Sequence, residues 1–199
     1  MAERERLPVR TFVAIDFDEA IRRRLALLQE RLRPRCPSLR WVSPAKIHLT
    51  LKFIGEIDAA QVVPIGHVLD EAAHHCLPFD ITVEQVGAFG EQGPVRVVWV
   101  GIKDADGALA RCHDLCERLL EPLGIRPETR RFRPHLTLAR NRATRHSQAI
   151  RRAIEPHKAW AVGIQAVDSL TFYESVATSG GQKYQPLSRH VFGAEHPGR

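Results

Sequence analysis

The chain has 199 residues, a mass of 22.4 kDa and a formal net charge of +6, with 44% hydrophobic and 26% charged residues. These values are typical of a soluble globular protein that buries its own core, and the scattered glycines and prolines exclude collagen-like and low-complexity classes. No apolar run approaches roughly 18 residues, which excludes a membrane span, and the charged N-terminus does not resemble a secretory signal.

Hydrophobic periodicity divides the chain into alternating strand and helix patterns. In chain order, the first half predicts a strand at 10–17, a helix at 19–33 capped by Asp18, strands at 39–42 and 46–54, and a helix from Asp58 to about Cys76. The second half predicts strands at 79–89 and 95–102, a helix at 105–123, a strand at 132–140, a helix at 146–154, and strands at 161–174 and 184–192. Because helices interleave with hairpin-like pairs of strands, this order predicts an α+β protein with antiparallel sheets.

The positive charge is concentrated in one segment. Residues 126–152 contain nine arginines and a single acidic residue, Glu128, which gives this segment a net charge of +8. Such local basicity indicates a site for an anionic partner, with phosphate first, because Arg presents a planar fork of donors. The alternative is a solvated surface in a protein that generally uses Arg in place of Lys, since only 5 of its 29 basic residues are Lys.

The four cysteines, at positions 36, 76, 112 and 116, do not form a C-x-x-C pair or a disulfide framework. Cys112 and Cys116 are four residues apart in a helical pattern and therefore share one helix face. A metal site with the neighbouring histidines is an alternative, but the paired ligand spacing of zinc sites is missing. We therefore expect buried, reduced thiols in a cytoplasmic protein and no metal site.

The strongest signal is a four-residue string that occurs twice: HLTL at 48–51 recurs 87 residues later at 135–138, and both copies lie in strand patterns. Side chains two residues apart in a strand point to the same face, so each copy presents His and Thr together while its leucines face the other way. The same alternation places Lys52 and Arg133 on the His faces. Arg140 falls on the opposite face of a regular strand, unless a bulge or a strand end reverses it.

Two such rows facing each other carry the groups for displacement at phosphorus without a metal. Histidine exchanges protons near neutral pH, so one neutral and one protonated imidazole supply a base and an acid. The hydroxyls and nearby cations hold the phosphate oxygens. A cyclic phosphodiester fits well, because attack by water opens the ring and releases one sugar hydroxyl. A single H-x-T would be interpreted as a structural histidine, so the hypothesis depends on the repetition.

The two H-x-T-x motifs resemble those of the 2H phosphoesterase superfamily. The similarity extends over almost the whole chain, through RTFVAIDF at 10–17, RWVSPAKIHLTLKFIGEI at 40–57, RFRPHLTLAR at 131–140 and LTFYESVATSGGQKY at 170–184. These segments are similar to the RNA 2′,3′-cyclic phosphodiesterases, a branch also described as 2′-5′ RNA ligases. The resemblance implies a bilobal α+β fold with two pseudo-twofold-related lobes around a central cleft. We expect a single domain over 1–199, with its two lobes intertwined and a mobile tail at 194–199.

The resemblance also implies a function, namely hydrolysis of a 2′,3′-cyclic phosphate at an RNA or nucleotide end to a 2′-phosphomonoester, without metal or cofactor. It implies that His48 is the proton donor and His135 the proton acceptor, with Thr50 and Thr137 beside them; the near-identical motifs alone do not assign the two roles. The residues predicted to bind the substrate are Lys52, Arg133 and Arg140. We expect the protein to be a cytoplasmic monomer with no membrane partner.

Three alternatives remain open at this stage. The first is 2′-5′ ligation of RNA ends at the same site, which is the chemical reverse of opening a 2′-5′ diester to a cyclic phosphate. The second is an RNA-binding module with a structural histidine pair, although no RNP-type aromatic pattern or G-x-x-G loop is evident. The third is a metal hydrolase that uses His48 and His135 as ligands.

Overall fold

The computed structural model describes residues 8–90, 93–142, 145–179 and 181–193. These residues form one sheet of nine strands, in which every pairing is antiparallel: β1 (Val9–Ile15), β2 (Arg40–Trp41), β3 (Leu49–Ile57), β4 (Phe79–Phe89), β5 (Val97–Lys103), β6 (His135–Arg140), β7 (Ala161–Val167), β8 (Ser169–Thr178) and β9 (Gly181–Val191). The helices are α1 (Glu19–Leu32), α2 (Val62–His74), α3 (Ala108–Leu120) and α4 (Ser147–Ile154). Short 3₁₀ turns occupy Arg33–Arg35, Pro44–Lys46, Ala59–Gln61, Glu121–Leu123 and Glu155–His157.

The order of strands in the sheet is symmetric about its centre. The order is β7-β4-β5-β6-β3-β1-β8-β9, with β2 paired to β6. The two central strands, β6 and β3, carry the second and first copies of the motif, and β5 and β1 flank them. Each half of the chain gives strands to the other half of the sheet: β4 pairs with β5, and β8 pairs with β1 and with β9. This arrangement confirms the predicted α+β fold with two pseudo-twofold-related lobes.

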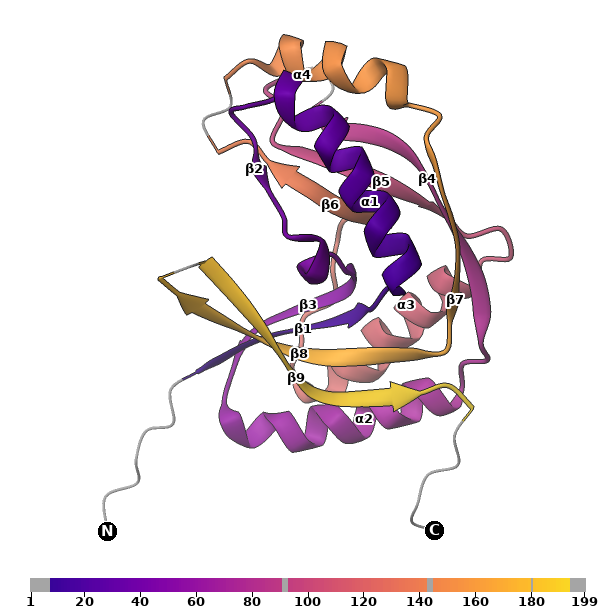
Figure 1. Cartoon of the computed structure of the whole chain (residues 1–199). Helices are drawn as coiled ribbons and strands as arrows, with labels where there is room; N and C mark the ends of the chain where they lie inside the picture. The colour runs from indigo at the N-terminus through magenta and orange to yellow at the C-terminus, as the bar shows by residue number, and fades with distance from the viewer. Residues whose placement is uncertain (1–7, 91–92, 143–144, 180, 194–199) are drawn as a thin grey trace.

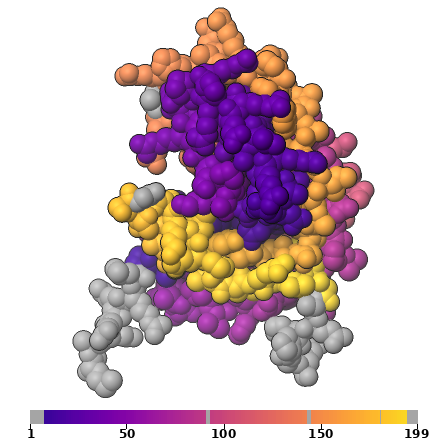
Figure 2. Space-filling model, in the orientation of Figure 1, coloured from indigo at the N-terminus to yellow at the C-terminus, as the bar shows by residue number. Residues whose placement is uncertain are grey.

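The helices cover the two halves of the curled sheet separately (Figure 1). Helix α1 packs against β7 and α4 against β4, while α2 and α3 pack on each other and on β9, β8 and β3. In the space-filling view, α1 covers the upper part and β9 the lower part of one face (Figure 2). The motif leucines, at positions 49, 51, 136 and 138, are at most 3% exposed, which confirms that they face the core.

Local signals explain most of the element boundaries, and two predictions need correction. Asp58 caps its turn as predicted, in a capping box with Gln61. Asp18 occupies the N-cap position of α1, but its side chain makes no capping hydrogen bond. The predicted strand at 161–174 is wrong as a single element. It divides at Asp168, because β7 pairs with β4 on one side of the sheet whereas β8 pairs with β1 on the other.

The pairing of β3 with β1 contains a β-bulge directly after the first motif threonine. Thr50 and Lys52 lie opposite consecutive residues of β1, so Leu51 is the extra residue. A bulge turns the following side chains to the other face of the sheet. Leu51 and Lys52 are consequently both buried, and Phe53, which follows them, is 66% exposed.

The second copy of the motif has the same bulge. In the pairing of β6 with β5, Thr137 and Ala139 lie opposite consecutive residues, and Leu138 is the extra one. Leu138 and Ala139 are both buried, and Arg140 is exposed. Arg140 therefore lies on the same face as His135 and Thr137. Regular alternation places it on the opposite face, and the bulge reverses this.

The prediction that Lys52 lies on the His face is wrong, and the bulge is the reason. Its side chain is only 3% exposed, and its ammonium donates to Glu117 Oε2 of α3 at 2.6 Å and to the carbonyl oxygen of Arg126 at 2.7 Å. Lys52 is thus a buried structural cation whose hydrogen bonds connect β3 to α3 and to the segment that precedes β6.

The prediction of a single domain over 1–199 with intertwined lobes stays a prediction, and the predicted tail at 194–199 lies outside the described residues. All four cysteines are buried free thiols, as the sequence predicts, and Cys112 and Cys116 share α3. None of the helices in the described ranges has the length and apolar character that crossing a bilayer requires.

Replacing Lys52 with Met should lower the free energy of unfolding by about 3 kcal/mol, because it leaves the Glu117 carboxylate buried without its cation. The double variant Lys52→Met/Glu117→Gln should recover most of this loss, since neither charge then remains unpaired. Urea denaturation followed by circular dichroism measures both effects. A single variant as stable as the wild type would contradict the assignment of Lys52 to a buried ion pair.

Candidate active site

The two copies of the motif meet at the centre of the sheet, where β3 and β6 share one ladder position, Leu49 opposite Leu136. In an antiparallel pair, residues on either side of such a position run in opposite directions. His48 therefore lies on the side of Thr137, and His135 on the side of Thr50. A single point of pairing is enough to bring four side chains together from segments 87 residues apart in the sequence.

The two imidazoles are fixed in the same way. His48 Nδ1 lies 2.9 Å from the carbonyl oxygen of Lys46, and His135 Nδ1 lies 2.7 Å from the carbonyl oxygen of Arg133. A carbonyl oxygen only accepts hydrogen bonds, so each Nδ1 carries a proton and donates it. In the neutral form of each ring, Nε2 is therefore the basic nitrogen and the atom that exchanges protons.

Burial lowers the pKa of His48 below its ordinary value, because the charged imidazolium loses solvation. The hydrogen bond to Lys46 and the nearby Asp16 carboxylate oppose this shift, whereas Arg22 and Arg140 add to it. His48 also packs against aromatic rings. The ring of Phe12 lies 4.9 Å from it, and the ring of Tyr184 lies 5.0 Å from it, edge to face.

Burial is also the main cause of the lowered pKa of His135. The hydrogen bond to the Arg133 carbonyl opposes the shift, and the positive charges of Arg140 and Arg133 add to it. The ring of Phe89 lies 4.8 Å from His135, edge to face, and the guanidinium of Arg133 lies over Phe89 at 5.8 Å. The two histidines therefore have similar surroundings, each with an aromatic wall and cations nearby.

The positive charge of Arg140 lowers the pKa of both histidines. Its place after the bulge accounts for this, since it stands on the His face of β6 beyond Thr137 and toward the end of β3 that carries His48. The equivalent position of β3 holds Phe53. The repeat therefore places an exposed arginine on one side of the centre and an exposed aromatic ring on the other.

A polar network lies behind His48. The hydroxyl of Tyr173 donates to the carboxylate of Asp16 at 2.8–2.9 Å, and the Thr171 hydroxyl donates to the same carboxylate at 3.0 Å. Burial is the main cause of the raised pKa of Tyr173, and the adjacent carboxylate adds to it, so this hydroxyl stays protonated as a donor. The guanidinium of Arg22, 3.7 Å from Asp16, donates to the carbonyl oxygens of Phe17, Pro44 and Ala45.

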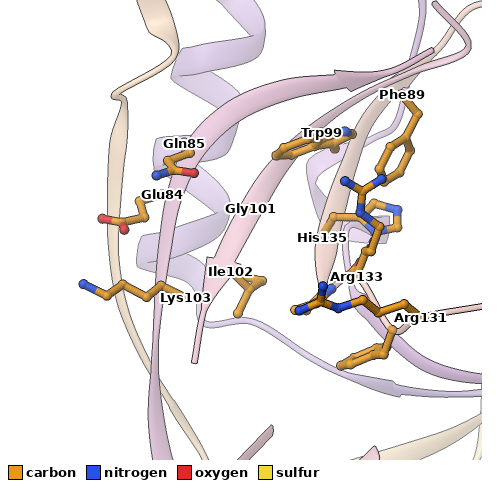
Figure 3. Close-up of a pocket in the computed structure, with 12 residues that line it drawn as sticks. Glu84, Gln85, Phe89, Trp99, Gly101, Ile102, Lys103, Arg131, Arg133 and His135 are labelled. Carbon is orange, nitrogen blue, oxygen red and sulfur yellow. Dashed lines mark hydrogen bonds between the residues drawn. The ribbon is translucent and has the colours of Figure 1, made fainter. Parts of the chain in front are cut away.

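A hollow opens beside each histidine. The Trp99 hollow has a volume of about 620 Å³ and lies between β4, β5 and the segment that precedes β6; its lining includes Phe89, Trp99, Gly101, Lys103, Arg131 and His135. In Figure 3, Arg131, Arg133 and His135 stand on one side of it and Glu84, Gln85 and Lys103 on the other. The Tyr184 hollow, of about 220 Å³, lies beside His48, and its lining includes Asp16, Arg22, Lys46, Lys183 and Tyr184.

Of the seven predicted site residues, the structure leaves out Lys52. It brings together the other six, which are His48, His135, Thr50, Thr137, Arg133 and Arg140. Sequence reasoning missed Trp99 and Tyr184. The string that contains Tyr184 carried the resemblance, but no spacing rule links either residue to a histidine. Among the described residues, no group of three or more His, Cys, Asp or Glu side chains is placed to hold a metal ion.

The chain is similar in sequence to known proteins over most of its length. A family model described as "LigT like Phosphoesterase" matches the chain twice, over residues 15–99 and 100–181. The RNA 2′,3′-cyclic phosphodiesterase of Aeropyrum pernix is 34% identical over 82% of this chain and 92% of that protein. The enzyme of the same name from Archaeoglobus fulgidus is 31% identical over 90% of this chain and 98% of that protein.

Solved structures show the same similarity. The crystal structure of Escherichia coli LigT complexed with 3′-AMP superposes with a TM-score of 0.76 at 26% identity and covers 93% of this chain and 98% of that one. A protein from Thermus thermophilus, 24% identical, has the same fold with a TM-score of 0.77 and covers 94% of this chain and 100% of that one.

Replacing Arg140 with Gln should raise the pKa of both His48 and His135, because its positive charge lowers both. The measurement is an NMR titration of the imidazole ring protons at low ionic strength, where exposed charges are least screened. Arg142→Gln, at an exposed arginine two residues further along the chain, is the matched control. Histidine titrations that stay unchanged in the Arg140 variant would contradict the placement of Arg140 near both rings.

Proposed function

The chain belongs to the LigT-like phosphoesterase family, and from this premise we propose that it hydrolyses 2′,3′-cyclic phosphate ends of RNA to 2′-phosphomonoesters. The relatives from Aeropyrum pernix, Methanothermobacter thermautotrophicus and Archaeoglobus fulgidus carry the name of that activity, and the match covers 92–98% of their length. The substrate is an RNA or a nucleotide, in keeping with the 3′-AMP complex of the E. coli relative.

The observation that carries this proposal is the pair of histidines with identical tautomers across one sheet position. Both Nδ1 atoms donate to the backbone, so both Nε2 atoms exchange protons. Displacement at phosphorus needs a base for the entering group and an acid for the leaving group, on opposite sides of the phosphorus. Two equivalent histidines from two lobes supply these two functions, and a threonine lies beside each of them.

In the proposed mechanism, neutral His135 accepts a proton from water while the water oxygen forms a bond to phosphorus. The bond between phosphorus and the ribose 3′ oxygen breaks, and protonated His48 gives its proton to that oxygen. The phosphate stays on the 2′ oxygen, which makes a 2′-phosphomonoester and a free 3′ hydroxyl. His48 then regains a proton and His135 loses one to solvent, which restores both groups.

The remaining phosphate oxygens develop more negative charge as the water attacks. We propose that the hydroxyls of Thr50 and Thr137 donate to them and that Arg140 supplies the balancing positive charge. Arg133 contributes from the His135 side. This set of neutral and cationic donors needs no metal or cofactor, so we propose a metal-free reaction.

We further propose that the protein acts as a cytoplasmic monomer. Both motifs of the site come from one chain, so a second copy is not required to complete it. All four cysteines are buried free thiols, which suits a reducing compartment.

The variants His48→Ala and His135→Ala should each lower kcat by about 10²–10⁴, because each removes a proton transfer. The pH profile of kcat/KM should be bell-shaped and centred below pH 6.5, since burial lowers both histidine pKa values from that value. Activity rises with pH as the base His135 loses its proton and falls as the donor His48 loses its own. His135→Ala should therefore lose the acid limb and His48→Ala the alkaline limb.

These profiles are measured with a cyclic mononucleotide, alongside circular dichroism to confirm that each variant is folded. If each variant loses the opposite limb, the donor and the acceptor are exchanged. If both keep the complete bell, neither histidine is the titrating group.

Treatment with EDTA should leave the rate of hydrolysis unchanged, and separation of the products should give the 2′-phosphate rather than the 3′-phosphate. Adenosine 2′,3′-cyclic phosphate is a suitable substrate for both measurements. A loss with EDTA that one divalent ion restores would overturn the metal-free mechanism. Joined RNA as the main product from ends bearing a cyclic phosphate and a 5′ hydroxyl would favour 2′-5′ ligation instead.

A further inference from the structure

We propose that the substrate ribose lies in one orientation across the cleft, with its base in the Trp99 hollow beside His135 and its 5′ chain over the Tyr184 hollow beside His48. This inference rests on the proposed function and adds the binding subsites to it. Apart from the two histidines and Arg133, the residues that line the two hollows have no part in the chemical step described above.

The connectivity of ribose gives the orientation. The 3′ oxygen leaves toward His48, and carbon 3′ is bonded to carbon 4′, which carries the 5′ chain. The 2′ oxygen stays on phosphorus, and carbon 2′ is bonded to carbon 1′, which carries the base. A donor at the 3′ oxygen therefore places the 5′ chain on the His48 side and leaves the base on the side of His135.

The Trp99 hollow has the size and floor that a base requires. Its volume of about 620 Å³ lies within the range of roughly 300–1,000 Å³ typical of small-molecule pockets, whereas the Tyr184 hollow, at about 220 Å³, does not. Trp99, Gly101 and Lys103 follow one another on the same face of β5, and the pairing with β6 sets Gly101 opposite His135. The floor next to the histidine therefore has no side chain.

The indole of Trp99 lies flat on the sheet because Gly87, the residue opposite it on β4, has no side chain. A Cβ on Gly87 would collide with the indole ring, and a Cβ on Gly101 would approach the carbonyl oxygen of Glu84 to 3.0 Å and the indole to 3.4 Å. Two glycines thus make room for a flat aromatic surface at the hollow (Figure 3). Bases of single-stranded RNA stack on such surfaces.

An irregularity in β4 shapes the side of the Trp99 hollow that lies across from His135. Gln85 has a positive φ of 66°, an uncommon conformation for a residue other than glycine, and β4 is irregular between Glu84 and Val86. The backbone N–H of Gln85 donates to the carbonyl oxygen of Trp160 and not to β5. Two consecutive polar side chains, Glu84 and Gln85, therefore line the hollow together, opposite Arg131 and Arg133. These groups can form hydrogen bonds to the edges of a stacked base.

The Tyr184 hollow has about a third of the volume of the Trp99 hollow, and it carries the charges that suit a phosphodiester. Lys46, Lys183 and Arg22 line it with one carboxylate, Asp16. The ammonium of Lys46 donates to the carbonyl oxygen of Gln182, which holds it at the end of the β8–β9 hairpin near Lys183. The phosphate that joins the terminal nucleotide to its 5′ neighbour is an anion that fits this position.

The test compares kcat/KM for three substrates: adenosine 2′,3′-cyclic phosphate, the 2′,3′-cyclic phosphate of 1-O-methylribose, which lacks a base, and the dinucleotide ApA with a 2′,3′-cyclic phosphate end. In the wild type, the base should raise kcat/KM by roughly 10–100-fold, since stacking of one base on an aromatic side chain contributes at that level. In Trp99→Leu, the ratio between adenosine and base-free substrates should fall to about threefold or less. In Lys183→Met, the ratio between dinucleotide and mononucleotide should fall instead.

Lys158→Met is the matched control, because Lys158 is an exposed lysine whose side chain pairs with Glu155, and it lines neither hollow. It should change neither ratio. The inference is overturned if the wild type has the same kcat/KM for the adenosine and the base-free substrates. It is also overturned if Lys183→Met lowers the ratio between these two substrates. If Trp99→Leu does not fold by circular dichroism, the wild-type and Lys183→Met ratios decide the question without it.

The outcomes also separate this inference from the proposed function. If none of the cyclic phosphates is hydrolysed, the function itself is wrong. If the product is the 3′-phosphate, the 2′ oxygen leaves toward His48, the ribose is reversed and the two ratios should respond to the opposite variants. If the 2′-phosphate forms and the ratios stay flat or are exchanged, only the subsite inference is wrong.

Discussion

The β-bulge after the threonine of each motif is the constraint on which the rest of the site depends. It inserts Leu51 into β3 and Leu138 into β6, and the residues directly after it, Lys52 and Phe53 in β3 and Arg140 in β6, point to the opposite face from the one that regular alternation predicts. Arg140 reaches the two histidines only because of this insertion. For the same reason Lys52, which alternation assigns to the histidines, lies in the core with Glu117. One extra residue per strand thus decides which cation lies on the face of the two histidines.

The pseudo-twofold arrangement explains how two nearly identical motifs act on one small group. Because β4 joins β5 and β8 joins β1, the halves are held together by exchanged strands on both sides of the central β3–β6 pairing. The histidines are fixed alike by backbone carbonyls, so the difference between them arises from their neighbours. The two hollows differ in size and charge, and the bulge places Arg140 on one side and Phe53 on the other. In the proposed mechanism, the symmetry of the fold supplies the acid and the base, and the differences between the two sides orient the substrate.

Burial and positive charge act in the same direction on both imidazoles. Each loses solvation, and Arg140 is near both, so the pKa of each falls below its ordinary value. An anionic phosphate between the rings offsets this effect, because it favours the protonated form. In the proposed mechanism, a bound substrate therefore favours the protonated imidazole that the leaving group needs, whereas burial and positive charge in the free protein favour the neutral form of both rings.

The amino-acid sequence determined the fold class and most element boundaries, because alternation and helical spacing are local properties. The repeated HLTL string by itself made His48, Thr50, His135 and Thr137 the candidate site residues, since a residue pattern that occurs twice needs no structure to be recognised. Only the tertiary structure decided which cations join them. A bulge depends on how a strand pairs with its neighbour, and nothing in residues 46–54 reveals that pairing. Two further features likewise depend on strands that are distant in the sequence and come together only when the sheet forms. These are the division of 161–174 into β7 and β8 and the space that Gly87 leaves for the indole of Trp99.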